Sequence, residues 1–98
     1  MPNANYLKGR RFEYETMATW REKGYEVIRA SGSHGSYDIV GYRRDRKPEF
    51  IQCKTTKILS IARSLLKSFQ KATLPSSFFH QTLTIKIKGT KVPISITI

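Results

Sequence analysis

Residues 37–54 read YDIVGYRRDRKPEFIQCK, and this stretch decides the fold. It contains one strand-like segment, 37–42, and most of a second, 48–55, separated by the strongly basic residues 43–47. Apolar, β-branched and aromatic segments on either side of a short polar connection predict an antiparallel hairpin. Within these strands stand Asp38, Gln52 and Lys54, where a small protein needs apolar side chains for its core. These three polar residues are therefore the first candidates for a functional site.

The register of this hairpin decides whether the three polar residues meet. A turn in the middle of the basic segment pairs Val40 with Phe50 and Asp38 with Gln52. Opposed side chains of an antiparallel pair project from the same face, and Lys54 lies two residues beyond Gln52 on that face. We therefore expect Asp38, Gln52 and Lys54 to gather at one end of a sheet. A one-residue slip of the register would scatter them.

The rest of the chain extends this hairpin into one α/β or α+β domain over residues 1–98. The expected order is α-β-β-β-α-β-β: a helix over 5–23, strands over 25–30, 37–42 and 48–55, a helix over 60–73, and a terminal hairpin within 81–98. Gly24 is placed to end the first helix. Ser60 is the expected N-cap of the second, with Ile61, Leu65, Leu66 and Phe69 facing inward.

Strict alternation in QTLTIKIKGTKVPISITI (81–98) predicts the terminal hairpin. A two-residue loop at Gly89 and Thr90 places three apolar pairs on one face: Ile87 with Val92, Ile85 with Ile94, and Leu83 with Ile96.

The first helix adds a fourth candidate, because Glu13 shares a helical stripe with Met17 and Trp20 and should point toward the sheet. A buried carboxylate needs a cationic partner. Either Lys54 or a metal ion can fill that role. The alternative is a purely structural ion pair of Lys54 with Glu13 or Asp38.

Charge and composition restrict the classes of partner expected for this protein. Eighteen basic residues against seven acidic ones give 98 residues a net charge of +11, which favours a polyanion, nucleic acid first and an anionic membrane surface second. No apolar run approaches the roughly eighteen residues of a membrane span. The N-terminal sequence lacks an apolar secretion signal, and the single cysteine, Cys53, fits a reducing cytoplasm. One cysteine and two distant histidines exclude a structural zinc site.

The chemistry of the candidate residues points to phosphodiester hydrolysis. Two carboxylates and an amide offer the oxygen ligands that Mg²⁺ prefers. A lysine beside such an ion can orient an attacking water or steady charge on a phosphate. Ser31, Ser33 and His34 stand in the adjoining connection, and the turn supplies arginines that suit a phosphate backbone.

Four motifs in order resemble a known family. KGRRFE (8–13), RASGS (29–33), YDIV (37–40) and IQCKTT (51–56) are similar to the pattern of archaeal Holliday-junction resolvases, which belong to the PD-(D/E)XK nuclease superfamily. The resemblance runs from about Lys8 to Thr56. It implies a mixed sheet flanked by helices and a metal-dependent endonuclease acting on branched DNA.

The resemblance also implies a role for each matching residue. Asp38 and Glu13 match the acids of the metal site, Lys54 the catalytic lysine, and Arg29, Ser31 and Ser33 loop positions near the scissile strand. Gln52 departs from the pattern, because resolvases carry glutamate there, whereas glutamine occurs in branches such as Mrr-like restriction nucleases. The amide can still bind a metal, but without charge.

We therefore expect a Mg²⁺-dependent endodeoxyribonuclease, with Mn²⁺ able to substitute, acting as a homodimer on a four-way DNA junction inside the cell, in a nucleoid or on viral DNA. The predicted catalytic residues are Lys54, Asp38, Gln52, Glu13 and Ser33, and the predicted metal ligands are Asp38, Gln52, Glu13 and the Cys53 backbone carbonyl. The predicted DNA-binding residues are Lys8, Arg10, Arg11, Arg29, Ser31, Ser33, His34, Arg43, Arg44, Arg46 and Lys57. An Mrr-like restriction or repair nuclease and a non-catalytic nucleic-acid-binding module of the same fold remain alternatives.

Overall fold

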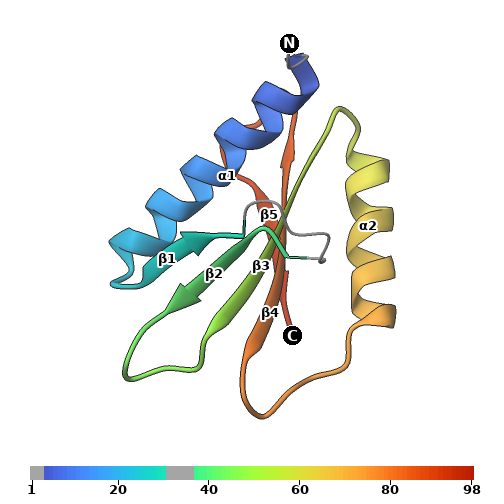
Figure 1. Ribbon diagram of the computed structural model, residues 1–98. Helices are drawn as coiled ribbons and strands as arrows, with labels where there is room; N and C mark the ends of the chain where they lie inside the picture. The colour runs from blue at the N-terminus through green and yellow to red at the C-terminus, as the bar shows by residue number, and fades with distance from the viewer. Residues whose placement is uncertain (1–3, 31–36) are drawn as a thin grey trace.

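The computed structural model describes residues 4–30 and 37–98. Its elements are α1 (Ala4–Glu22), β1 (Glu26–Arg29), β2 (Ile39–Tyr42), β3 (Glu49–Thr56), α2 (Leu59–Ala72), β4 (His80–Ile87) and β5 (Ile94–Thr97). The strands form one five-stranded sheet in the order β1-β2-β3-β4-β5 (Figure 1). Because β3 and β4 are parallel and the other neighbours antiparallel, the sheet is mixed, as the resemblance implied.

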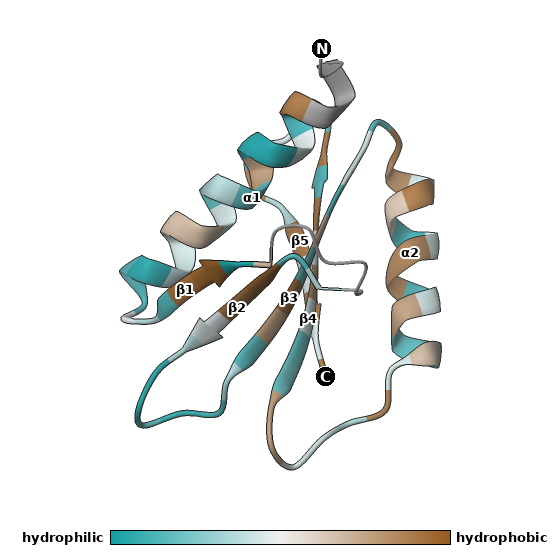
Figure 2. Cartoon of the chain, viewed as in Figure 1, coloured by the Kyte–Doolittle hydropathy of each residue, from teal (hydrophilic) through white to brown (hydrophobic). Residues whose placement is uncertain are grey.

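The two helices cover opposite faces of the sheet. Met17 of α1 is buried against Val27, Ile39 and Ile51, which lie on β1, β2 and β3. Ala62 of α2 belongs to a second cluster, together with the buried β4 residues Leu83, Ile85 and Ile87. Partly buried residues of α2 and β5 complete this cluster: Leu65, Leu66, Phe69, Ile94 and Ile96. In Figure 2 the apolar segments follow β1, β2 and α2, whereas the turn between β2 and β3 is hydrophilic. Each helix therefore screens a different part of the sheet.

The predicted register of the β2–β3 hairpin is confirmed. Val40 pairs with Phe50, and the last pair toward the start of β2 is Ile39 with Ile51. Asp38 lies just beyond that pair. Its N–H donates to the Ile51 carbonyl at 2.9 Å, so that β2 leaves the ladder at this residue instead of pairing Asp38 with Gln52 as the sequence suggested.

Gly24 ends α1 as predicted, with a φ of +91° that favours glycine. The Tyr25 N–H donates to the Trp20 carbonyl at 3.2 Å and the Gly24 N–H to the Arg21 carbonyl at 2.9 Å. These bonds are the Schellman pattern, which satisfies carbonyls at the helix end. The Trp20 and Tyr25 rings meet edge to face across it, with centroids 5.0 Å apart. The turn thereby directs the chain from α1 into β1.

Two predictions about α2 were wrong. Its N-cap is Ile58, which makes no side-chain cap, and Ser60 lies inside the helix that begins at Leu59. Ile61 is 47 % exposed, while Ala62 is the buried residue of this helix. A helix that covers one edge of a sheet buries a narrow stripe, so a small residue fits directly against the strands.

The terminal hairpin was predicted in part. Leu83 pairs with Ile96 and Ile85 with Ile94. The expected pair of Ile87 with Val92 is absent from this ladder, and Val92 is 77 % exposed. Because Pro93 precedes the first residue of β5 and has no N–H, it cannot continue the ladder toward the turn.

Within residues 4–30 and 37–98, neither helix has the length and apolar character needed to cross a membrane.

Candidate functional site

Asp38 is held where β2 and β3 separate. Its carbonyl accepts a hydrogen bond from the Ala30 N–H at 2.8 Å, and its own N–H donates to the Ile51 carbonyl. Its carboxylate oxygen Oδ2 accepts from the Cys53 backbone N–H at 2.8 Å. These bonds link the aspartate to both neighbouring strands, so its side chain has a defined position beside β3.

Glu13 reaches the same region from α1, but its partner is Arg29. The Arg29 Nε lies 3.0 Å from the Glu13 Oε1, and the two side chains are 24 % and 19 % exposed. The need for a cationic partner was predicted correctly, whereas the partner was not. Among the described residues, Lys54 forms an ion pair with neither Glu13 nor Asp38. The structural ion-pair alternative for Lys54 is therefore wrong.

Cys53 lies between the two carboxylates. It packs against the core cluster beneath α1. Burial, together with the nearby charges of Asp38 and Glu13, raises the pKa of the Cys53 thiol to about 12, although a hydrogen bond with Thr16 opposes the rise. The charges of Asp38, which precedes β2, and of Glu13 on α1 therefore both act on the Cys53 thiol.

Gln52 and Lys54 lie on the other face of β3. They stand beside Leu83 and Ile85 of β4, which belong to the cluster covered by α2. Gln52 is half-buried and Lys54 is exposed. Asp38 is therefore bonded to the strand that carries Gln52 and Lys54 on the face opposite Cys53.

An aromatic group borders Gln52 on its own face of the sheet. The Phe50 ring lies 5.6 Å from that of Tyr37 and 4.8 Å from that of Phe79. The Tyr37 hydroxyl donates to the Gln81 Oε1 at 2.6 Å, and burial raises the pKa of Tyr37. The sequence pattern assigned Tyr37 and Gln81 no role, because their hydrogen bond joins residues 44 positions apart in the chain.

The donors available for a metal are few. Among residues 4–30 and 37–98, no group of three or more His, Cys, Asp or Glu side chains could hold an ion. Asp38, Gln52 and Glu13 offer two carboxylates and one neutral amide. The amide at Gln52, which the sequence identified as a departure, is what leaves the acidic set short of a third member.

The predicted DNA-binding residues divide into separate groups. Lys8, Arg11 and Lys57 line one groove, together with Lys86 and Lys88, which the sequence pattern did not identify. Arg10 lies 6.0 Å from the Tyr14 ring centroid on α1. Ser31, Ser33 and His34, and the connection 31–36 that carries them, lie outside the described residues.

The basic turn between β2 and β3 lies at the opposite end of this hairpin from Asp38 (Figure 1). Arg43 contributes to the fold here: its Nη1 donates to the Lys23 carbonyl at 3.0 Å, and its Nε lies 2.8 Å from the Asp45 carboxylate. Arg44 and Arg46 are exposed.

A mixed sheet with a helix on each face, and an aspartate held beside β3 just before β2, agrees with the PD-(D/E)XK class of nuclease folds. The sequence profile of the archaeal Holliday junction resolvase (Hjc) family matches residues 4–65, which is more than half of the chain. The chain belongs to this family.

A solved structure agrees with the assignment of the fold. The Archaeoglobus fulgidus Hjc, a Holliday junction resolvase from an archaeal hyperthermophile, superposes with a TM-score of 0.55 at 18 % identity, covering 91 % of this chain and 83 % of that one. At this identity the likeness concerns the fold alone. No match was found among curated protein sequences.

Proposed function

We propose that this protein is a structure-selective DNA endonuclease that hydrolyses phosphodiester bonds of a four-way junction. Membership of the resolvase family supports the reaction class and the substrate class. The observation that carries the proposal is the hydrogen bond from the Cys53 N–H to the Asp38 carboxylate. It holds the acid beside the strand segment that presents Gln52 and Lys54, which is the arrangement that metal-assisted hydrolysis requires.

The donor set suits Mg²⁺, with Mn²⁺ as a substitute. Asp38 uses Oδ2 for the Cys53 N–H, and its other oxygen accepts no hydrogen bond among the described residues. That oxygen, the Gln52 amide oxygen and the Cys53 carbonyl are proposed ligands, while Glu13, already paired with Arg29, would act through water. The ion, when bound, would neutralise charge on the phosphate.

Lys54 is the proposed catalytic lysine. It is exposed, and among the described residues it forms no ion pair, so its ammonium can approach a phosphate or an attacking water. Ser33 and the neighbouring residues of 31–36 are proposed to contact the scissile strand, on the resemblance of their sequence alone.

One alternative rests on a specific observation. The acidic set lacks a third member because Gln52 is an amide, which favours a non-catalytic nucleic-acid-binding module more than it would in a protein with glutamate there. The other alternative is an Mrr-like restriction or repair nuclease, and it rests on the same residue, Gln52. Cleavage assays on several DNA structures separate all three.

A two-fold dimer is the proposed form, because a junction presents two strands to be cut symmetrically. Sedimentation equilibrium should return twice the 11.3 kDa mass of one chain. A monomeric mass at working concentrations, with or without junction DNA, would contradict this proposal.

The central experiment compares cleavage of a four-way junction, a linear duplex and a single strand in Mg²⁺ and in excess EDTA. We expect cleavage of the junction only with metal, and its loss in Asp38→Asn and Lys54→Ala, with DNA binding largely retained. Glu26→Gln and Lys71→Ala are the controls, since both residues are exposed and lie away from the candidate site. Binding without cleavage in every condition would favour the non-catalytic module, and cleavage that persists in EDTA would overturn the metal assignment.

A further inference from the structure

A basic groove of about 540 Å³ runs along the flank of α1 that faces β4. Its charged lining comes from the start of α1, the end of β3 and the end of β4: the cations are Lys8, Arg11, Lys57, Lys86 and Lys88. Glu15 is the one acidic residue that lines it among the described residues. Five cations around one carboxylate make the groove a site of strong positive potential.

The groove continues into a second hollow of about 290 Å³ between α1 and β5. The two share Phe12, Glu15 and Lys86, and the second is also lined by Lys23 and Lys91. Its floor carries hydroxyls instead of apolar side chains: Thr82 and Thr97 share a hydrogen bond of 2.8 Å, and Ser95 donates to Thr84 at 2.8 Å. A basic, hydroxyl-lined track therefore follows α1 over much of its length.

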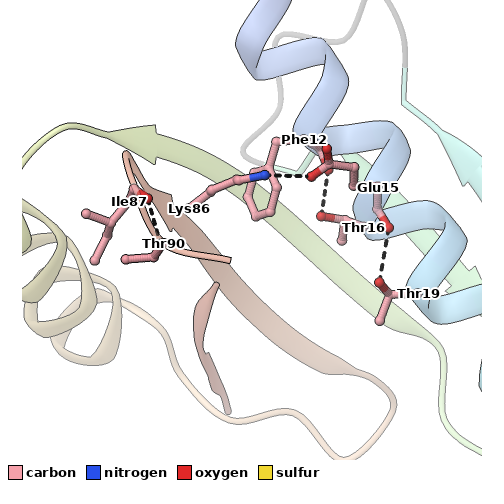
Figure 3. Close-up of polar contacts among 7 residues, drawn as sticks. All are labelled: Phe12, Glu15, Thr16, Thr19, Lys86, Ile87 and Thr90. Carbon is pink, nitrogen blue, oxygen red and sulfur yellow. Dashed lines mark hydrogen bonds and ion pairs between the residues drawn. The ribbon is translucent and has the colours of Figure 1, made fainter. Parts of the chain in front are cut away.

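This track is separated from the candidate site by α1 itself. Glu13 faces Arg29 of β1 on one flank of the helix, whereas Glu15 faces Lys86 of β4 on the other. Figure 3 shows Lys86 extending from β4 to Glu15, with the Phe12 ring beside it. The track is thus a second surface, and none of its cations contacts the Asp38 carboxylate in the described structure.

We propose that this track binds the sugar-phosphate backbone of a DNA arm that leads away from the candidate site. Lysine and arginine side chains with neighbouring hydroxyls are the groups that contact phosphates without reading sequence. The charge excludes an apolar occupant, and the length of the groove along α1 suits a linear polyanion better than a single small anion. The proposal rests on the proposed action on DNA, and it adds the location of one contact surface.

In the free protein, Glu15 pairs with one cation of this surface. The Lys86 Nζ lies 3.0 Å from the Glu15 Oε2, and both side chains are partly exposed. Exposed ion pairs contribute little to stability, so a phosphate can displace the carboxylate from Lys86. Glu15 would then repel the bound backbone, so its removal should strengthen binding.

The first test replaces cations. Lys86→Ala with Lys88→Ala is compared with Lys67→Ala and Lys71→Ala on α2, which removes the same charge elsewhere on the surface. Fluorescence anisotropy in EDTA measures the affinity for a labelled junction and a duplex over a salt series. We expect a loss of affinity well beyond that of the control, and a slope of log affinity against log salt that is shallower by ~1.8, because each phosphate that is no longer neutralised reduces the slope by about 0.9. Equal effects of the two double variants would overturn the proposal.

The second test removes a carboxylate from the groove and predicts a gain in DNA affinity. Glu15→Gln and Glu22→Gln each raise the net charge by one from the same helix, but only Glu15 lines the groove. We expect Glu15→Gln to bind DNA several-fold tighter than Glu22→Gln. Equal affinities, or a groove variant that loses binding to an acidic polypeptide while it keeps DNA binding, would overturn the proposal.

These measurements remain separate from the proposed catalytic function, because they read binding without metal. If the protein does not cleave DNA but its DNA affinity still depends on Lys86 and Lys88, the nuclease proposal is wrong and the proposed binding surface stands. Thermal unfolding of each variant, compared with wild type, establishes that a change in affinity is not a loss of the folded protein.

Discussion

Gln52 sets the charge of the candidate site at the scale of a single residue. It lies on β3 one residue before Cys53, whose N–H binds the Asp38 carboxylate, so Gln52 and Asp38 are close neighbours at the margin of the sheet. An amide in this position adds an oxygen donor but no negative charge. Metal binding should therefore be weaker than with an acid.

Changing Gln52→Glu should lower the Mg²⁺ concentration that gives half-maximal cleavage, because a charged ligand binds the ion more strongly. Without metal, two neighbouring carboxylates repel, so the metal-free variant should unfold at a lower urea concentration than wild type. A Mg²⁺ titration of both proteins on one substrate measures the first effect. An unchanged Mg²⁺ requirement would mean that Gln52 is not a ligand.

Glu49 is a buried acid that the candidate site does not use. It is 6 % exposed, its Oε2 has no hydrogen-bond partner among the described residues, and burial raises its pKa, with His80 and Lys23 opposing the rise. A carboxyl whose pKa is raised by folding stabilises the protein below its usual pKa, and that stabilisation is lost as the pH rises through the raised value. The ionised form of Glu49 therefore destabilises the folded protein.

Replacing Glu49→Gln removes this titration. We expect the free energy of unfolding of the variant, minus that of wild type, to increase as the pH rises from below the ordinary pKa of a carboxyl through the raised pKa of Glu49. Urea unfolding at several pH values measures the difference. Glu26→Gln, at an exposed position of β1, is the control and should show no comparable trend. A pH-independent difference for Glu49→Gln would contradict the prediction.

At the scale of an element, the end of α1 determines where β1 begins. Gly24 adopts a φ of +91°, and Tyr25 returns its N–H to Trp20. Gly9 is the natural comparison, because it lies inside the same helix with no atom near the place of an added Cβ.

The two glycines should respond in opposite directions to alanine. Gly24→Ala should lower the free energy of unfolding by ~1 kcal/mol or more, because a β-carbon is disfavoured at positive φ. Gly9→Ala should raise it by about 0.5–1 kcal/mol, because alanine loses less conformational entropy in a helix. Chemical denaturation measures both, and a destabilising Gly9→Ala would show that Gly9 is needed for something other than the helix.

At the scale of the whole molecule, the net charge of +11 is spread over more than one surface. One is the groove along α1, and another is the turn between β2 and β3. Because the two lie on different parts of the fold, DNA that contacts both would extend across the protein.

Affinity for DNA should fall steeply with salt, and replacing Arg43, Arg44 and Arg46 together with alanine should flatten the dependence by ~0.9 for each phosphate that these side chains neutralise. Since Arg43 also bonds to the Lys23 carbonyl, Arg44→Ala with Arg46→Ala is the cleaner variant. Lysine at both positions keeps the charge and should keep the slope. Binding that hardly responds to salt would refute the electrostatic basis of recognition.

Local patterns were enough to predict the elements. Strand periodicity predicted the pairing of Val40 with Phe50, and glycine chemistry predicted the end of α1 at Gly24. The cap at Ser60 and the pair of Ile87 with Val92 failed, because each depends on where α2 and β5 meet the sheet. The predicted gathering of Asp38, Gln52 and Lys54 rested on one hairpin register, which is local information: Val40 pairs with Phe50 as that register requires, whereas Asp38 does not pair with Gln52.

By itself, the sequence determined the order of helices and strands, the β2–β3 register and the basic character of the surface, since these depend on residues close in the chain or on composition. Only the tertiary structure decided which groups pair across elements. Glu13 meets Arg29 rather than Lys54, the Asp38 carboxylate binds the Cys53 N–H, and Glu15 meets Lys86, which lies 71 residues away. The pairing of Glu13 with Arg29 requires α1 to pack beside β1, and that of Glu15 with Lys86 also requires the parallel β3–β4 crossover. Such layer packing arises from burial of the whole molecule, and no short pattern encodes it.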